Sequence, residues 1–245
     1  MIVVAGPATV ARAVAAIVAS LVAALWGWRR LRSTPEPPAD PDAGHWVKPA
    51  YRDVADARLL TLALLLAAAL AALATTQLGG APARIWVPVL AAWAVSAGLG
   101  TVAVLCDLHT TYLPSALLRP WAVLTAAALL ALGTLAVEAD PARGGSLLLR
   151  LVACVAVARL GFWLWWRLGG ALGFGDVRLA SIFAADAAMV SVSTWQTWLV
   201  VGTALGAAWG VTVALTRRRR PSGLGSAFPY GPALAIGAWV ALALG

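Results

Sequence analysis

A succession of long apolar segments constrains the fold of this chain more than any other feature. Of its 245 residues, 62% are hydrophobic and only 11% are charged. Backbone N–H and C=O groups find no water inside a bilayer, so a segment that crosses it must be a helix or belong to a closed barrel. The segments are rich in Ala, Leu and Val and lack the alternation of barrel strands. The sequence therefore predicts an all-α, polytopic integral membrane protein rather than a soluble domain.

About eight segments are long enough to cross a hydrocarbon core of about 30 Å. They are Val4–Trp28, Leu59–Gln77, Ile85–Cys106, Trp121–Val137, Ser146–Leu168, Val177–Val192, Trp195–Thr216 and Phe228–Gly245. In the first segment the positive charges follow the apolar run instead of preceding it, so we expect a retained helix and not a cleaved signal peptide.

Positive charge then predicts the orientation. The formal net charge of +8 would suggest nucleic acid as a partner of a soluble protein, but here short loops hold the basic residues and we expect no nucleic-acid binding. If the chain starts outside, the outer loops hold only Arg84, Arg143 and, at a segment border, Arg150. The inner loops hold Arg29, Arg30, Arg32, Lys48, Arg52, Arg58, Arg119, Arg167, Arg178 and the Arg217–Arg220 run. Both termini are therefore predicted on the extracytoplasmic side.

This topology divides the chain into three parts. Residues 1–28 form the first transmembrane helix, residues 29–58 a short cytoplasmic polar loop, and residues 59–245 a membrane domain of about seven helices. The middle of the loop is rich in Pro, Asp and Gly and is not expected to have a packed core of its own.

Two aspartates at the ends of apolar segments are the candidate chemical groups. Asp107 follows the third segment in CDLHTTYLP, and Asp176 precedes the sixth in GGALGFGDVR. The topology, which was set by Lys and Arg alone, places both at the cytoplasmic face. Purely structural roles stay open: Asp is a preferred helix N-cap residue, which suits Asp176, and a loop acid such as Asp107 can simply be solvated.

Together, the two carboxyl groups would form a dyad that shares one proton. The ionised member takes a proton from a water molecule, which attacks a peptide carbonyl, while the protonated member donates to the carbonyl oxygen. Such chemistry needs no metal, organic cofactor or covalent intermediate. Gly173 and Gly175 remove side-chain bulk beside Asp176, so a backbone can approach it closely.

Other charged residues have several possible roles. Asp186 lies ten residues after Asp176 and about 15 Å farther along a helix, so we expect it to pair with Arg159 or to belong to an ion path. Arg178 could hold anionic lipid headgroups, pair with Asp176 or mark the inner face. His109 is more typical of a solvated loop residue than of a catalytic one.

The motifs resemble those of the type IV prepilin peptidases, which are GxGD-type membrane aspartic proteases. CDLHTTYLPSALLRP is similar to the family's first aspartate motif, GGALGFGDVRLA to its GxGD motif, and FPYGPALAIGAW to the stretch that opens its final helix. The resemblance implies an endopeptidase of the bacterial plasma membrane that removes a short basic leader from prepilins or pseudopilins at the cytoplasmic face. It implies Asp107 and Asp176 as the catalytic pair, with Gly173, Gly175 and Arg178 in the loop that admits the substrate.

The sequence also departs from that family. Many members contain paired CxxC motifs after the first helix, which this chain lacks, so we expect no zinc site there and leave methyl transfer open. Arg178 replaces the usual Lys. A transporter or channel that uses Arg159 and Asp186 in an ion path is the alternative function, because intramembrane acids are frequent in transporters.

Overall fold

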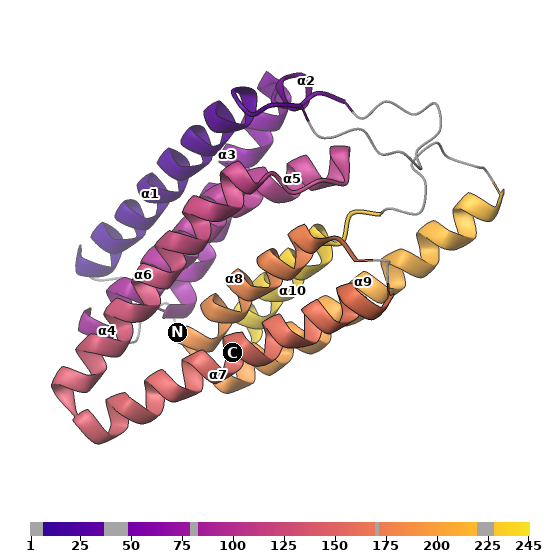
Figure 1. Cartoon of the computed structure of the whole chain (residues 1–245). Helices are drawn as coiled ribbons and strands as arrows, with labels where there is room; N and C mark the ends of the chain where they lie inside the picture. Colours follow the sequence, from indigo (N-terminus) through magenta and orange to yellow (C-terminus); the bar gives the residue numbers. More distant parts are fainter. Residues whose placement is uncertain (1–6, 37–48, 79–82, 170–171, 220–227) are drawn as a thin grey trace.

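The computed structural model describes residues 7–36, 49–78, 83–169, 172–219 and 228–245, and these residues form helices and no strand (Figure 1). The prediction of an all-α fold is confirmed. The elements, in chain order, are α1 (Pro7–Arg32), α2 (Tyr51–Val54), α3 (Ala57–Leu78), α4 (Ala83–Val95), the π-helix η1 (Ser96–Gly100), α5 (Thr101–Thr110), α6 (Ser115–Ala139), α7 (Pro141–Gly169), α8 (Phe174–Val190), α9 (Val192–Arg219) and α10 (Gly231–Leu244).

Within the described residues, six helices are long and apolar enough to cross a membrane, which is compatible with a polytopic membrane protein. They cover Ala8–Arg32, Ala57–Leu78, Ile85–Thr110, Ser115–Ala139, Pro141–Gly169 and Val192–Thr216. Helices α8 and α10 are shorter, with 17 and 14 residues. The outer surface is apolar as well: on α1, Val10, Val14, Val18 and Val22 form an exposed stripe at helical spacing. Such a surface suits lipid rather than water.

The helices that contain Asp107 and Asp176 have boundaries that differ from the predicted ones. The third segment continues to Thr110, so Asp107 lies inside a helix and not after it. The sixth begins at Phe174, so Asp176 lies in its first turn. In the predicted polar loop, Tyr51 of α2 is buried. Residues 37–48, the Pro- and Asp-rich middle of that loop, lie outside the described residues.

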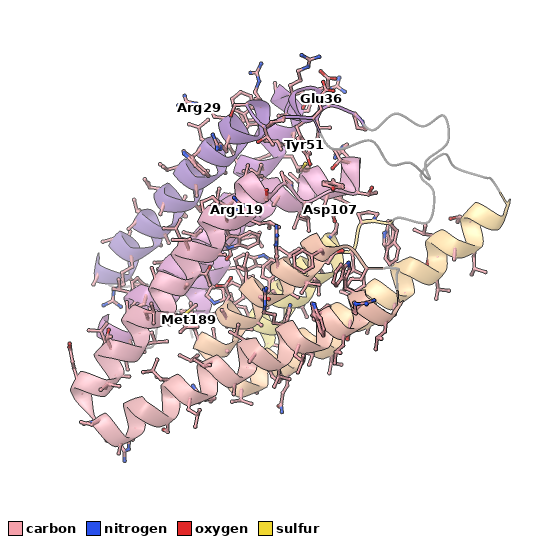
Figure 2. All side chains as sticks on the ribbon, viewed as in Figure 1. Arg29, Glu36, Tyr51, Asp107, Arg119 and Met189 are labelled. Carbon is pink, nitrogen blue, oxygen red and sulfur yellow. The ribbon has the colours of Figure 1, made fainter. Side chains whose placement is uncertain are left out.

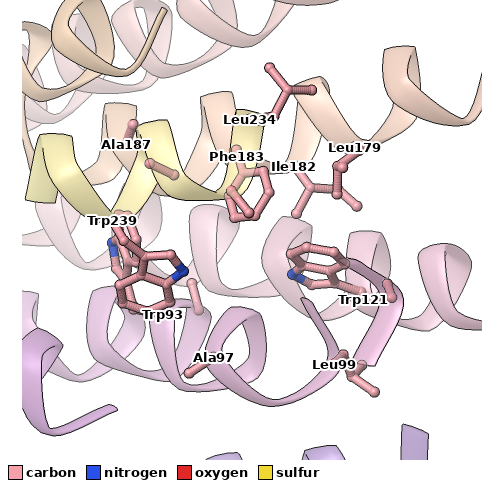
Figure 3. Packing of buried hydrophobic residues seen from close by; sticks show 14 of the residues in the cluster. Trp93, Ala97, Leu99, Trp121, Leu179, Ile182, Phe183, Ala187, Leu234 and Trp239 are labelled. Carbon is pink, nitrogen blue, oxygen red and sulfur yellow. The ribbon is translucent and has the colours of Figure 1, made fainter. Parts of the chain in front are cut away.

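The long helix of α4, η1 and α5 runs through the interior of the bundle. Most residues in the apolar stretch of this helix are buried, whereas most residues in the apolar stretches of the other long helices are not. Helix α8 is buried on nearly all sides between Val177 and Met189. A helix that is apolar all round needs such a central position. Large rings fill the space between these central helices and their neighbours, with Trp93 against Trp239 and Trp121 against Phe183 (Figure 3).

Small residues allow α1 and α3 to pack closely. Ala63, Ala67, Ala71 and Ala74 recur along one face of α3 and are fully buried. Ser20 of α1 donates its hydroxyl to the carbonyl oxygen of Ala67 at 3.2 Å. Lipid tails are as apolar as the helix surface, so the hydrophobic effect does not drive helices together in a bilayer. Close packing of small side chains and interhelical hydrogen bonds drive their association instead.

The helix directions bring three distant segments to one end of the bundle. Helix α5 ends there, and α8 and α10 begin there, at the upper right in Figure 1. Helix α1 begins and α10 ends at the opposite side of the bundle. The end shared by α5, α8 and α10 contains the candidate site.

Candidate active site

A cavity of about 450 Å³ lies where α5 ends and α8 begins. Asp107 and Asp176, the two predicted dyad residues, both line it. The other predicted loop residues, Gly173, Gly175 and Arg178, line the same cavity. Its remaining walls come from Thr111, Tyr112, Leu113, Ser115 and Phe174. The structure therefore brings together all five residues that were singled out from the sequence.

Asp107 lies in the last turn of α5, at the end of the bundle opposite Met189 (Figure 2). Only 3% of its surface is exposed, which excludes the role of a solvated loop acid. Thr111, the C-cap residue, has a φ of 53° and donates its backbone N–H to the carbonyl oxygen of Asp107 at 2.7 Å. A β-branched residue rarely adopts this left-handed conformation, and such strain is concentrated at functional sites.

The start of α10 holds the Asp107 carboxylate. The backbone N–H of Gly231 donates to Asp107 Oδ2 at 3.0 Å. A Cβ atom at Gly231 would lie 2.8 Å from this oxygen and 3.1 Å from Leu179 Cδ2, so any other residue would displace the Asp107 carboxyl group. The contact joins residues that are 124 positions apart in the sequence.

Asp176 occupies the third position of α8. Its Oδ2 accepts the backbone N–H of Gly173, the N-cap residue, at 3.0 Å. The helix-capping role is therefore real, although Asp176 acts from the first turn and not as the N-cap itself. Asp176 Oδ1 is buried and has no hydrogen-bond partner among the described residues. One oxygen thus fixes the start of α8, while the other forms no hydrogen bond with the described residues.

Neither aspartate forms an ion pair with a basic side chain of the described residues. Arg178 lies close to Asp176 in the sequence, yet its guanidinium stands over the Phe174 ring, 4.8 Å from the ring centroid. Pairing of Arg178 with Asp176, one of its three predicted roles, is therefore not found. Two buried carboxyl groups thus line one cavity with no cation paired to either of them among the described residues.

Two tyrosines that the sequence did not single out stand near the aspartates. Tyr51 of α2, labelled with Asp107 in Figure 2, is buried. Burial is the main cause that raises its pKa well above the usual value, and the nearby Cys106, Tyr112 and Asp107 raise it further. Tyr230, which precedes α10, is also buried, and its hydroxyl donates to the carbonyl oxygen of Thr203 at 3.5 Å. Both phenols stay protonated at neutral pH and can act as hydrogen-bond donors.

The sequence contained only indirect signals for these additional residues. Tyr230 and Gly231 belong to the FPYGP stretch that was noted as a motif, but no role was attached to them. A glycine directly before Pro232 at the start of an apolar helix is the pattern that could have identified a tight contact. Thr111 and Tyr51 gave no comparable signal, because an αL conformation and burial of a loop tyrosine arise from tertiary packing.

Three other sequence predictions have separate outcomes. The expected pairing of Asp186 with Arg159 is wrong, because Asp186 Oδ2 accepts the hydroxyl of Ser96 instead. Arg159 donates to Ser181 Oγ at 3.4 Å. His109 is exposed, hydrogen-bonds the carbonyl oxygen of Leu105 at 2.8 Å through Nδ1, and does not line the aspartate cavity.

In comparisons with known proteins, no family model, no curated protein and no solved structure matches this chain.

Proposed function

We propose that this protein is a membrane aspartic endopeptidase that cleaves the short basic leader from prepilin-like or pseudopilin substrates. The observation that carries the proposal is the shared cavity of Asp107 and Asp176. These residues come from different helices, are both buried, and have no basic partner among the described residues. The motif resemblance supplies the class of substrate.

In the proposed reaction, one carboxylate takes a proton from a water molecule and the other carboxyl group donates to the peptide oxygen. Asp176 Oδ1 supports these roles, because it has no hydrogen-bond partner among the described residues while Oδ2 holds the helix cap. The Gly231 N–H holds Oδ2 of Asp107 in place, so Oδ1 is the oxygen that we assign to proton transfer. When the gem-diol intermediate collapses and its C–N bond breaks, the dyad donates one proton to the leaving amine and takes one proton from a gem-diol hydroxyl, which restores its starting state.

An apolar groove next to the site supports a substrate that is itself a membrane helix. This groove, of about 460 Å³, lies among α3, α5, α8 and α10. Leu108, which follows Asp107, and Pro232, which follows Gly231, line it together with Val104, Ala235 and Ile236. An apolar helix placed there would present its end to the aspartates, and apolar grooves commonly bind helices in this way.

The proposal includes an orientation. Helix α8, with a length of about 26 Å, and the shorter α10 would complete eight membrane crossings with both termini outside. The basic residues at the ends of α1 and α7, Arg29, Arg30, Arg32 and Arg167, would then lie at the same face as the aspartates. We propose a bacterial plasma membrane location, with the aspartates at the cytoplasmic side.

Co-expression with a prepilin, followed by a gel shift and N-terminal sequencing, tests the proposal. Asp107→Asn and Asp176→Asn should each abolish leader removal, because an amide cannot accept or donate the required proton. Membrane insertion of the variants is checked by fractionation. Asp186→Asn is the matched control, since Asp186 is equally buried but lies outside the cavity. Full processing by either dyad variant would refute the proposal.

The same variants separate the peptidase from a transporter or channel. An ion path through Arg159 and Asp186 would be most damaged by changes at those two residues. The structure gives them different partners, Ser181 for Arg159 and Ser96 for Asp186, which weakens that alternative. Loss of function in Asp186→Asn with normal function in Asp107→Asn would favour it.

A further inference from the structure

A third hollow opens between α6, α7 and α8, and we call it the arginine groove. It has a volume of about 250 Å³ and is lined by Leu118, Arg119, Ala122, Thr125, Ala126, Leu129, Val155, Arg159, Arg178, Ser181, Ile182 and Ala185. Ala122, Ala126 and the side chain of Arg159 are exposed, so the groove faces the outside of the bundle. For a helix bundle in a bilayer, that side is occupied by lipid.

Three arginines line this groove, and none has a carboxylate partner among the described residues. Arg159 donates only to the neutral Ser181 hydroxyl, and Arg178 stands over the Phe174 ring. Unpaired positive charges on the lipid-facing side of a membrane protein are unfavourable unless an anion or the interface satisfies them. The groove therefore has an excess of positive charge to be neutralised.

The charges and the apolar walls are separated along the groove. Arg119 and Arg178 are the fifth residues of α6 and α8, so both lie near the end of the bundle that contains the aspartates. Leu129 lies ten residues farther along α6, which is about 15 Å deeper. Val155 precedes Arg159 by one turn of α7 and so also lies on the deeper side. A charged rim above an apolar channel fits a molecule with an anionic head and a long hydrocarbon tail.

We propose that the arginine groove binds one anionic phospholipid, with its phosphate among Arg119, Arg159 and Arg178 and one acyl chain along Ala122, Leu129 and Val155. Basic pockets between membrane helices are known to bind anionic headgroups. Because Arg178 also lines the aspartate cavity, the bound lipid would border the candidate active site. This inference does not depend on the proposed peptidase function.

Native mass spectrometry of the full chain in neutral detergent tests the proposal, with phosphatidylglycerol and phosphatidylcholine as the probes. We expect one tightly bound phosphatidylglycerol and no equivalent phosphatidylcholine. Arg119→Gln and Arg159→Gln should each weaken phosphatidylglycerol binding by about five-fold, and the double variant by about twenty-fold or more. Arg150→Gln is the matched control, because Arg150 is also exposed on α7 but does not line the groove.

A second variant guards against loss of folding in the arginine variants. Ala126→Phe leaves every arginine in place and fills the apolar part of the groove, so it should also lose the tightly bound lipid while its thermal midpoint without lipid is unchanged. The proposal would be overturned if both lipids bound equally, or if binding were unchanged in Ala126→Phe and in the double arginine variant. It would also be overturned if inorganic phosphate raised the thermal midpoint of the protein as much as phosphatidylglycerol does. None of these measurements requires leader cleavage, so failure of the peptidase proposal would leave them interpretable.

Discussion

The backbone N–H of Gly231 donates to Asp107 Oδ2 at 3.0 Å and thereby joins the start of the last helix to the end of α5. A neutral donor of this kind can hold a carboxyl group without supplying a positive charge. An arginine or lysine in the same place would favour a permanently ionised carboxylate, which suits a proton-sharing pair poorly. The contact therefore fixes the position of Asp107 and leaves it free to exchange a proton.

Gly231→Ala should strongly reduce leader removal while the protein still inserts into the membrane. The added Cβ would lie 2.8 Å from Asp107 Oδ2, so the carboxyl group has to move. A shift of about 1 Å at a reacting group can lower the rate by about a hundred-fold. Processing of a co-expressed prepilin over time measures the effect. Gly161→Ala, where the added Cβ meets nothing within 4 Å, should process normally.

Gly175→Val should block the cavity, and a smaller residue opposite should relieve the block. A Cβ atom at Gly175 would lie 3.0 Å from Leu113 Cβ, across the cavity wall. We expect about a ten-fold or greater loss of processing in Gly175→Val and partial recovery in the double variant with Leu113→Gly, which removes that Cβ atom, because neighbouring substitutions are not additive. If the double variant lost as much processing as the sum of the two single variants at Gly175 and Leu113, this contact would not control the entry of substrate into the cavity.

The sequence was sufficient to predict the helices, because each long apolar segment has no stable alternative in lipid. Segments such as Trp121–Val137 and Trp195–Thr216 lie entirely within observed helices. Their ends were less predictable. Helix α5 continues past Cys106 to Thr110, and in this last turn Asp107 and Thr110 are buried against the rest of the bundle whereas Leu108 and His109 are exposed.

The sequence placed both aspartates at one face, and the structure puts them in one cavity. Their partners could not be predicted in the same way. Asp186 pairs with Ser96, which is 90 positions away, and Asp107 with the Gly231 N–H. A backbone donor has no residue-specific signature, and two central helices decide which hydroxyl faces Asp186. Arg159, a basic residue inside another predicted membrane segment, was therefore a poor guide to the partner of Asp186.

Asp186 should be important for stability but not for leader removal. Its Oδ2 accepts the Ser96 hydroxyl, whose oxygen in turn accepts Trp121 Nε1–H at 2.8 Å. Asp186→Asn keeps an acceptor and should unfold at nearly the normal temperature. Asp186→Leu leaves the buried Ser96 hydroxyl without its acceptor, which costs about 0.6 to 2 kcal/mol. Thermal unfolding in detergent measures the difference, and equal midpoints for the Asn and Leu variants would contradict this role.

Trp93 should be a major source of stability through its ring and not through its indole N–H. The side chain is fully buried, with its ring centroid 4.8 Å from that of Trp239, while its Nε1–H has no partner among the described residues. Trp93→Ala should lower the free energy of unfolding by about 3 to 5 kcal/mol, since it leaves a large cavity.

Trp93→Phe keeps an aromatic contact with Trp239 and removes the unsatisfied donor, so its loss should be much smaller. Trp209→Ala is the matched control, because Trp209 is 45% exposed and its removal opens no internal cavity. Thermal midpoints in one detergent, compared across the three variants, measure the order. If Trp93→Phe lowered the thermal midpoint as much as Trp93→Ala, the indole N–H of Trp93 would itself contribute to stability, contrary to this prediction. If Trp209→Ala were equally damaging, burial at the centre of the bundle would not explain the effect.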